Sequence, residues 1–288
     1  MSIFKLLGAE SVAPPLSQDQ SSRVVSVWGS NGSGKTTIAS NLAFELSSLG
    51  RRTLLIDADS YSPGVAPALG ITEPGPGILA ALRLARQQRL DSAELTRLTK
   101  ELAFESSTLK LLPGISAQLR WSEFDAPAIQ TLMGHARSEF DFVVVDLASP
   151  LEPGLYAPES SVSRNQATLS FIENSEVVLG CFLADPVGVN RFLWDVRLAG
   201  FDYWPIANRV RSQVLGKNPD RQLKDAIHQL TKRELNHILP EDSAAADSAL
   251  CRAQPLIVAA RNSKLRDALR RLALDVIDGS TKLPKREH

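Results

Sequence analysis

The residues best suited to chemistry lie in one short run near the start of the chain. The run reads Gly29-Ser30-Asn31-Gly32-Ser33-Gly34-Lys35-Thr36 and fits the phosphate-binding loop pattern G-x-x-x-x-G-K-[ST] at every position. In such a loop the backbone N–H groups around the glycines point at phosphate oxygens. We therefore expect Lys35 to place a positive charge beside the β- and γ-phosphates and Thr36 to ligate Mg²⁺.

The sequence on either side of this run supplies the strand and the helix that such a loop needs. Residues 23–28 read as a buried strand, and residues 35–48 place Ile38, Leu42 and Leu46 on one helical face. A chance Gly/Ser turn is the alternative interpretation. Such a turn would not be expected to carry both a strand before it and a helix after it.

Acidic residues end two further predicted strands. Residues 52–57 lead into Asp57-Ala58-Asp59, and residues 142–146 finish in Asp146. Ligands of open α/β sheets bind beyond the carboxyl ends of the strands. We expect Asp146 to hold Mg²⁺, often through water, together with the hydroxyl of the loop. For each acid, a plain turn or strand-end cap is the alternative.

Predicted strands alternate with predicted helices along the rest of the chain. This alternation indicates a single α/β domain with three layers, a mostly parallel sheet of about seven strands with helices on both faces. The remaining strands are expected at residues 109–112, 177–183, 204–208 and 236–240. The remaining helices are expected at residues 78–87, 91–100, 126–139, 187–199, 218–234 and 263–277.

The two ends of the chain and one internal stretch differ in composition from this pattern. We divide the chain into a flexible leader (residues 1–22), the α/β domain (residues 23–278) and a polar tail (residues 279–288). The leader carries a small apolar cluster, so it is either mobile or a short docking helix for a partner or a membrane surface. Residues 147–168 are rich in Pro and Ser and directly follow Asp146, at the expected metal site. Such a long irregular stretch is functional or disordered, and it could change shape with the nucleotide state.

The overall composition limits the partners that we expect. Lys plus Arg and Asp plus Glu each number 32, so net charge gives no reason to expect a nucleic-acid partner. The two cysteines, Cys181 and Cys251, lie far apart, which favours a reduced, cytoplasmic protein over a disulfide scaffold. No apolar run approaches the length of a membrane-spanning helix. We therefore expect at most peripheral membrane contact, through recruitment by a partner.

The order of these pieces resembles the MinD/ParA family of P-loop ATPases, of the SIMIBI class. The resemblance runs over residues 23–277, nearly the whole chain. It is carried by the loop as far as Thr37 and by short elements in the family's order: Leu55-Ile56-Asp57-Ala58-Asp59, Leu111-Leu112-Pro113-Gly114, Phe142-Val143-Val144-Val145-Asp146, Asp185-Pro186, Ile206-Ala207-Asn208-Arg209-Val210 and Leu239-Pro240-Glu241-Asp242. The stretch from Asp57 to Gly70 looks most like the CpaE/TadZ-like pilus-assembly branch.

The resemblance implies a nucleotide cycle with ATP and Mg²⁺ as cofactors. Family members bind Mg·ATP, dimerise face to face around it, and are reset to the ADP state by hydrolysis, while protein partners read the state. The residues that it assigns to the nucleotide are Gly29 to Thr37, Asn208 at the adenine edge, and Arg209, Pro240 and Glu241 near the base. Guanine readers carry Lys and Asp where this chain has Arg209 and Arg211, so ATP is favoured over GTP.

The same resemblance implies two catalytic residues and a metal site. Lys35 matches the phosphate lysine, and Asp59 matches the acid that positions the attacking water. Thr36, Asp59 and Asp146 match the residues around Mg²⁺. The resemblance thus predicts an ATP hydrolase that acts as a switch in positioning or assembling a cellular machine, such as a pilus, a division site or a partition system.

This chain departs from the family pattern at its second loop position. The family places there a lysine that reaches the phosphates of the partner copy, whereas this chain has Ser30, followed by Asn31 in place of Gly. A neutral hydroxyl cannot supply that charge, so we expect weak intrinsic hydrolysis. A nucleotide-binding scaffold with little turnover is the alternative. A small-molecule kinase, ligase or amidotransferase is a third interpretation. Such an enzyme would be expected to carry extra substrate-binding charges or a catalytic cysteine near the phosphate site, and the sequence offers no support for either.

Overall fold

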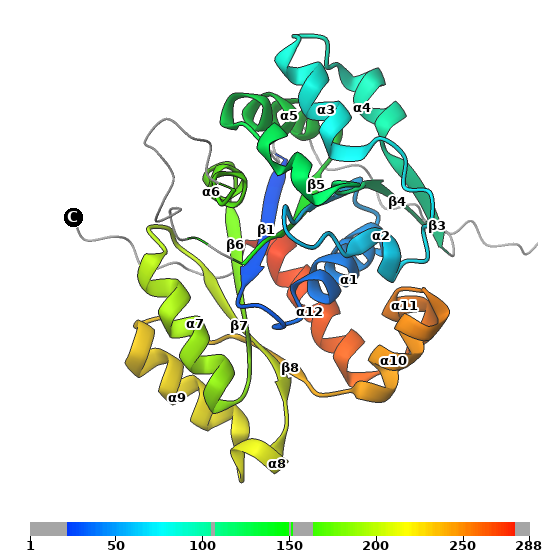
Figure 1. The fold of residues 1–288 in the computed structure, drawn as a ribbon. Helices are drawn as coiled ribbons and strands as arrows, with labels where there is room; N and C mark the ends of the chain where they lie inside the picture. Colours follow the sequence, from blue (N-terminus) through cyan, green and yellow to red (C-terminus); the bar gives the residue numbers. More distant parts are fainter. Residues whose placement is uncertain (1–21, 105–106, 150, 152–163, 280–288) are drawn as a thin grey trace, which may run out of the picture.

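A single sheet runs through the part of the chain that the computed structural model describes, residues 22–104, 107–149, 151 and 164–279 (Figure 1). Within these residues the sheet has eight strands. They are β1 (Arg23–Gly29), β2 (Thr53–Ala58), β3 (Lys100–Phe104), β4 (Ser107–Leu112), β5 (Phe142–Leu147), β6 (Val177–Leu183), β7 (Trp204–Val210) and β8 (His237–Pro240). Their order is β3-β4-β2-β5-β1-β6-β7-β8, and neighbours are parallel except β3 and β4. The predicted α/β class is confirmed, with one strand more than expected.

Helices cover both faces of this sheet (Figure 1). They are α1 (Lys35–Ser48), α2 (Val65–Ala68), α3 (Gly77–Arg86), α4 (Ser92–Leu98), α5 (Ala126–Glu139), α6 (Gln166–Glu173), α7 (Pro186–Leu198), α8 (Ser212–Leu215), α9 (Pro219–Thr231), α10 (Ser243–Arg252), α11 (Leu256–Ala259) and α12 (Lys264–Asp278). A 3₁₀ helix, η1, spans Gln118–Glu123. One face packs against α1, α11 and α12, and the other against α3, α5, α6, α7 and α9.

The central strands are apolar because both of their faces are covered. Side chains alternate along a strand, so Val25 and Val27 of β1 pack on the α1 side while Val24 and Trp28 pack on the opposite side. β5 alternates in the same way. Burial on both sides explains why these strands read as unbroken apolar runs in the sequence.

β3 corrects one prediction. We expected a helix over residues 91–100, but α4 ends at Leu98 and an edge strand begins at Lys100. Leu102 pairs with Leu109 of β4 in antiparallel register. Because β3 is short and only part of it is buried, its sequence has too few apolar positions to show a strand period.

Two further boundaries differ from the predictions. The stretch expected to be irregular over residues 147–168 is shorter, because α6 begins at Gln166. α10 and α11 fill a region in which we expected a loop. The expected leader up to residue 21, the tail from residue 280, and residues 150 and 152–163 lie outside the described residues. Among the described residues, no helix combines the length and apolar character needed to cross a membrane.

The strand order places the phosphate-loop sequence at the centre of the molecule. β1 lies between β5 and β6, and the chain reaches β2 on one side of it and β6, β7 and β8 on the other. The strand order therefore reverses beside β1, which is the place where open α/β sheets bind ligands. Parallel register brings Asp57 of β2 level with Asp146 of β5, and Asp146 level with Val27 of β1.

Candidate functional site

Two glycines give the loop between β1 and α1 its shape. Gly29 ends β1 with φ 145°, and a Cβ atom there would lie 2.0 Å from the carbonyl oxygen of Cys181. Gly34 precedes α1 with φ 89°, and a Cβ atom there would lie 2.4 Å from Nδ2 of Asn208. Positive φ and close neighbours both exclude larger residues at these positions. The loop is thereby held against β6 and β7.

Lys35 turns its ammonium group inward, beneath the loop. Its side chain is buried, and its Nζ donates to Oγ of Ser149 at 2.6 Å and lies 3.5 Å from the carbonyl oxygen of Ser30. Ser149 lies two residues beyond the end of β5, the strand that carries Asp146. A buried ammonium group with neutral partners retains a strong attraction for anions such as phosphate.

Thr36 and Asp146 meet as the sequence predicts. The Thr36 hydroxyl donates to Oδ2 of Asp146 at 2.6 Å. The other oxygen, Oδ1, is buried and has no hydrogen-bond partner among the described residues. Burial first, and then the neighbouring Asp57 carboxyl, raises the pKa of Asp146 well above its ordinary value. A bare carboxylate oxygen in such a place fits a cation or a cation-bound water, which would favour the ionised form.

Asp57, a strand-end acid noted in the sequence without a predicted role, also lies in the site. Its carboxylate is buried and accepts from the backbone N–H groups of Val65 at 3.0 Å and Asp59 at 3.3 Å. Burial is the largest influence and raises the pKa of Asp57 to about 7. A Cβ atom on Gly114 would lie 2.9 Å from its Cγ, so the chain packs closely around this acid.

Asp59 is placed beside the site rather than within the contact between Thr36 and Asp146. Its Oδ1 accepts from the backbone N–H groups of Tyr61 and Ser62, both at 2.8 Å, which holds the carboxylate in its own turn. The Tyr61 hydroxyl donates to Oδ1 of Asn165 at 2.7 Å. The turn after β2 is therefore attached to the start of α6.

Ser30 has a partner within its own chain. Its hydroxyl donates to Oδ2 of Asp195 on α7 at 2.7 Å, and the residue is buried. No pattern in the sequence predicts this contact or the contact between Lys35 and Ser149. Both partners come from distant segments that carry no motif, so only the tertiary structure brings them to the loop.

Asn208 holds the loop from the side of β7. Its Nδ2 donates to the carbonyl oxygen of Ser33 at 2.7 Å, and its Oδ1 accepts from the backbone N–H of Arg209 at 2.9 Å. Arg209 has φ 56° and an exposed side chain. Glu241, beyond β8, forms an ion pair with Arg211 at 3.1 Å. Asn208 and Arg209 thus lie at the loop, whereas Pro240 and Glu241 form the adjacent strand end.

A hollow of about 170 Å³ opens between the first turn of α1 and the helices α10 and α11. Its lining includes Thr36, Thr37, Arg209, Ala246, Leu250 and Pro255. Leu250 is 68% exposed, so the wall on the α10 side presents apolar surface to solvent. The hollow is smaller than sites that enclose whole drug-sized ligands, and it suits one flat ring.

The acids of the site do not form a metal cage by themselves. Within the described part of the chain, no group of three or more His, Cys, Asp and Glu side chains is arranged to hold a metal ion. Mg²⁺ in nucleotide sites keeps several waters and binds through one or two protein groups plus phosphate oxygens. The pair of Thr36 and Asp146 fits a Mg²⁺ site of this nucleotide-bound kind rather than a cage of protein side chains.

Comparison with known proteins assigns the fold and the loop to a family. The model of the CobQ/CobB/MinD/ParA nucleotide binding domain matches residues 24–256. The chain belongs to this family. The predicted membership of the MinD/ParA group is confirmed.

Individual relatives agree with this assignment. The septum site-determining protein MinD of Synechocystis is 25% identical over 232 residues, which cover 76% of each chain. A ParA family ATPase from Chlorobium tepidum has a TM-score of 0.73 at 18% identity, over 89% of this chain and 99% of that one. The MinD protein of Pyrococcus horikoshii, solved with Mg-ADP, has a TM-score of 0.68 at 18% identity, over 92% and 100%. The two solved structures show the same fold.

Proposed function

We propose that this protein binds Mg·ATP and acts as a nucleotide-dependent switch in positioning or assembling a cellular machine. The observation that carries the proposal is the contact between Thr36 and Asp146, with the bare Oδ1 of Asp146 buried beside it. The ammonium group of Lys35 supplies the positive charge for the phosphates. These groups surround a loop of the phosphate-binding pattern in a chain of a nucleotide-binding family.

The residues of the site divide the work of phosphoryl transfer among them. Thr36 and Asp146 would hold Mg²⁺, which when bound neutralises charge on the phosphate oxygens. Lys35 would bind the β- and γ-phosphates, and the backbone N–H groups of the loop would orient them. Asp59, which its own turn orients at the rim of the site, would position the attacking water.

The base end of the nucleotide would lie in the hollow beside Thr36 and Thr37. The Arg209 side chain and the apolar wall of α10 line this hollow. An aromatic ring gains from burial against such a wall and from a cation near its face. Asn208, Pro240 and Glu241 would bound the base from the side of β7 and β8. Arg209 and Arg211, in place of the Lys and Asp of guanine readers, favour ATP.

A nucleotide-binding scaffold with little turnover is the second candidate function. The specific observation that favours it is Ser30, whose hydroxyl is engaged by Asp195 of the same chain. A hydroxyl brings no charge to the phosphates of a second copy, whereas cationic groups at that place accelerate phosphoryl transfer by orders of magnitude. Binding itself would then be the signal that partners read.

We propose a cytoplasmic protein whose ATP state controls its association with other chains. A nucleotide-dependent homodimer would be formed around the bound ATP, and a protein partner of an assembly or positioning system would read it. The CpaE/TadZ-like pilus-assembly branch is the placement that the turn after β2 favours. Membrane contact would be peripheral, through the partner.

An ATPase assay combined with sizing chromatography, with and without Mg·ATP, tests this proposal. The switch predicts a dimer that forms with Mg·ATP and a measurable, slow turnover, both lost in Lys35→Ala. A complex of unchanged size with bound ATP but no turnover would favour the scaffold. Unchanged size without ATP binding would contradict both.

A further inference from the structure

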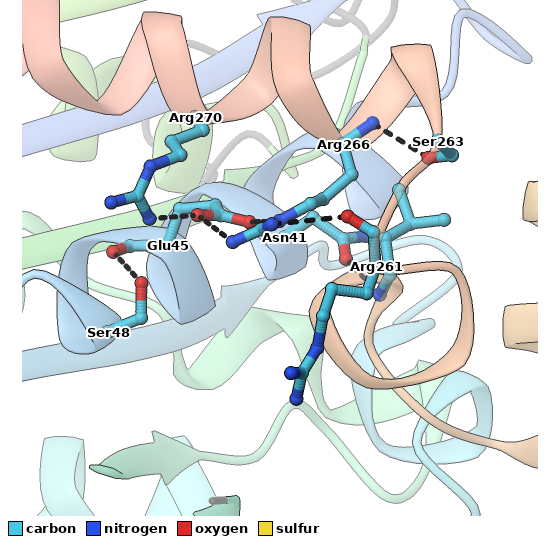
Figure 2. A network of polar contacts seen from close by, with 8 residues as sticks. Asn41, Glu45, Ser48, Arg261, Ser263, Arg266 and Arg270 are labelled. Atoms are coloured by element: carbon cyan, nitrogen blue, oxygen red, sulfur yellow. Dashed lines mark hydrogen bonds and ion pairs between the residues drawn. The ribbon is translucent and has the colours of Figure 1, made fainter. Parts of the chain in front are cut away.

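Helix α1 carries a polar stripe that runs from an exposed first-turn residue, Thr37, to two buried residues, Asn41 and Glu45. Thr37, Asn41 and Glu45 follow one another at intervals of four residues, so they lie on one side of the helix. Thr37 borders the hollow, and Glu45 lies two turns further on, only 1% exposed. Buried polar groups are costly unless they are paired, so such a stripe needs a reason. Figure 2 shows Asn41 and Glu45 with the arginines that lie beside them.

Two arginines of α12 neutralise Glu45. Its Oε1 accepts from Nε of Arg266 at 2.7 Å, and its Oε2 accepts from Nη1 of Arg270 at 3.3 Å (Figure 2). Arg266 also donates through Nη1 to the carbonyl oxygen of Arg261, in the turn between α11 and α12. A buried carboxylate between two guanidinium groups tolerates little displacement. Glu45 therefore fixes α12, and the turn that precedes it, against the helix of the phosphate loop.

Asn41 makes the corresponding connection closer to the loop. Its Oδ1 accepts from the backbone N–H of Leu256 at 2.7 Å, and its Nδ2 donates to the carbonyl oxygen of Thr37 at 2.8 Å. The Leu256 N–H belongs to the first turn of α11 and has no acceptor within that helix. Asn41 thus sets the distance between the first turn of α1 and the segment Pro255–Leu256, which lines the hollow.

We propose that Asn41 and Glu45 are positioning residues that hold the α10–α11 wall of the hollow at the distance that the nucleotide base requires. The inference rests on the proposed function, because it takes ATP to be the ligand and the hollow to receive its base. The phosphates are held by the loop, whereas the base is held by a wall that belongs to another segment. Asn41 and Glu45 connect the loop helix to this wall, so that the nucleoside end of the ligand contributes to affinity.

The test separates the two ends of the ligand. Binding of ATP and of inorganic triphosphate, both with Mg²⁺, is measured for the wild-type chain and for Asn41→Leu, which keeps the size but removes both hydrogen bonds. We expect ATP affinity to fall about tenfold, as for loss of a buried hydrogen-bonding group, while triphosphate affinity stays within about twofold. Glu45→Gln, which keeps the shape but not the charge, should act in the same direction.

Two further variants guard against a purely structural explanation. Ser263→Ala removes the cap of α12, in which the Ser263 hydroxyl accepts from the Arg266 N–H at 3.0 Å, without touching the stripe on α1. It should lower the unfolding temperature and leave the ratio of the two affinities unchanged. Leu250→Ala truncates an exposed side chain on the wall, so it folds normally and should weaken ATP but not triphosphate.

The results distinguish this inference from the proposed function. Equal losses of ATP and triphosphate affinity in Asn41→Leu would overturn the inference, because Asn41 would then act on the phosphate loop. A change in the ratio of the two affinities that is as large in Ser263→Ala as in Asn41→Leu would also overturn it, because the effect would then come from the packing of α1 and α12 as a whole. Wild-type protein that binds both ligands equally well would also overturn it, while leaving the phosphate site intact. Wild-type protein that binds neither ligand would remove the proposed function itself.

Discussion

Ser30 shows how one side chain can alter what a phosphate loop does. By the loop pattern its position is unconstrained, whereas by the family pattern it should carry a lysine. In the structure its hydroxyl is bound to Asp195, so the residue joins the loop to α7 instead of reaching outward. We propose that this one substitution separates the binding of phosphate, assigned to Lys35, from the charge that would speed phosphate transfer.

Restoring the lysine should raise turnover most when Asp195 is also changed. In Ser30→Lys the new ammonium group lies beside the Asp195 carboxylate and would pair with it inside one chain. We expect Ser30→Lys/Asp195→Asn to raise kcat at least about tenfold over wild type, and Ser30→Lys alone to raise it less. The measurement is steady-state ATP hydrolysis at saturating Mg·ATP, with Asp195→Asn alone as the control. Equal rates in all four proteins would mean that no composite site forms between two copies.

At the same scale, the sequence predicts contacts that a motif defines and misses those that it does not. Lys35 and Thr36 belong to the loop pattern, Asp146 ends a predicted strand, and Thr36 and Asp146 meet in the structure. The roles of these residues toward phosphate and Mg²⁺ stay predictions. Ser149 and Asp195 have no pattern, because their importance lies in where the fold brings them. The roles of Asp59 in hydrolysis and of Asn208 at the base stay predictions.

Among the elements, the sequence is most informative where one face is buried and the other is not. α5 was expected at residues 126–139 and spans those residues, because its apolar residues repeat with the period of a helix. α10 is rich in alanine and serine and buries mainly Ala245, so its sequence has no such period. The edge strand β3 was missed for the same reason.

His237, at the start of β8, makes the stability of the fold depend on pH. It is buried, and its ring stacks on Trp204 with the centroids 6.0 Å apart. Burial lowers the pKa of His237, although Asp275 opposes the shift. Because the folded state then binds its proton more weakly than the unfolded chain, this contribution to stability is complete above the ordinary pKa of about 6.5 and is lost as the pH falls below it.

Replacing this histidine should therefore protect the fold from acid. His237→Phe keeps a ring against Trp204 but cannot be protonated. Urea midpoints at about pH 8 should be similar in the two proteins, whereas at about pH 5 the variant should unfold at higher urea than wild type. A variant that lost as much stability as wild type on acidification would show that other groups carry the effect.

Across the whole molecule, strand order explains why one loop can collect residues from the length of the chain. β1 is central, so the carboxyl ends of β2 and β5 supply acids on one side, while β6 and β7 support the loop on the other. The alternation of elements predicts the class of fold from the sequence. The pairing of distant strands does not follow from any local pattern, so the eight-strand order and the hollow had to come from the structure.

The central claim is that the loop between β1 and α1 binds Mg·ATP through Lys35, and calorimetric titration tests it most directly. Wild-type protein should bind ATP more tightly with Mg²⁺ than without it. Lys35→Ala should lose at least about tenfold in affinity, as for loss of a charged hydrogen-bond donor. Lys110→Ala, which removes a lysine paired with Glu101 at the edge of the sheet, should bind like wild type. Equal ATP affinity in wild type and Lys35→Ala would contradict the account.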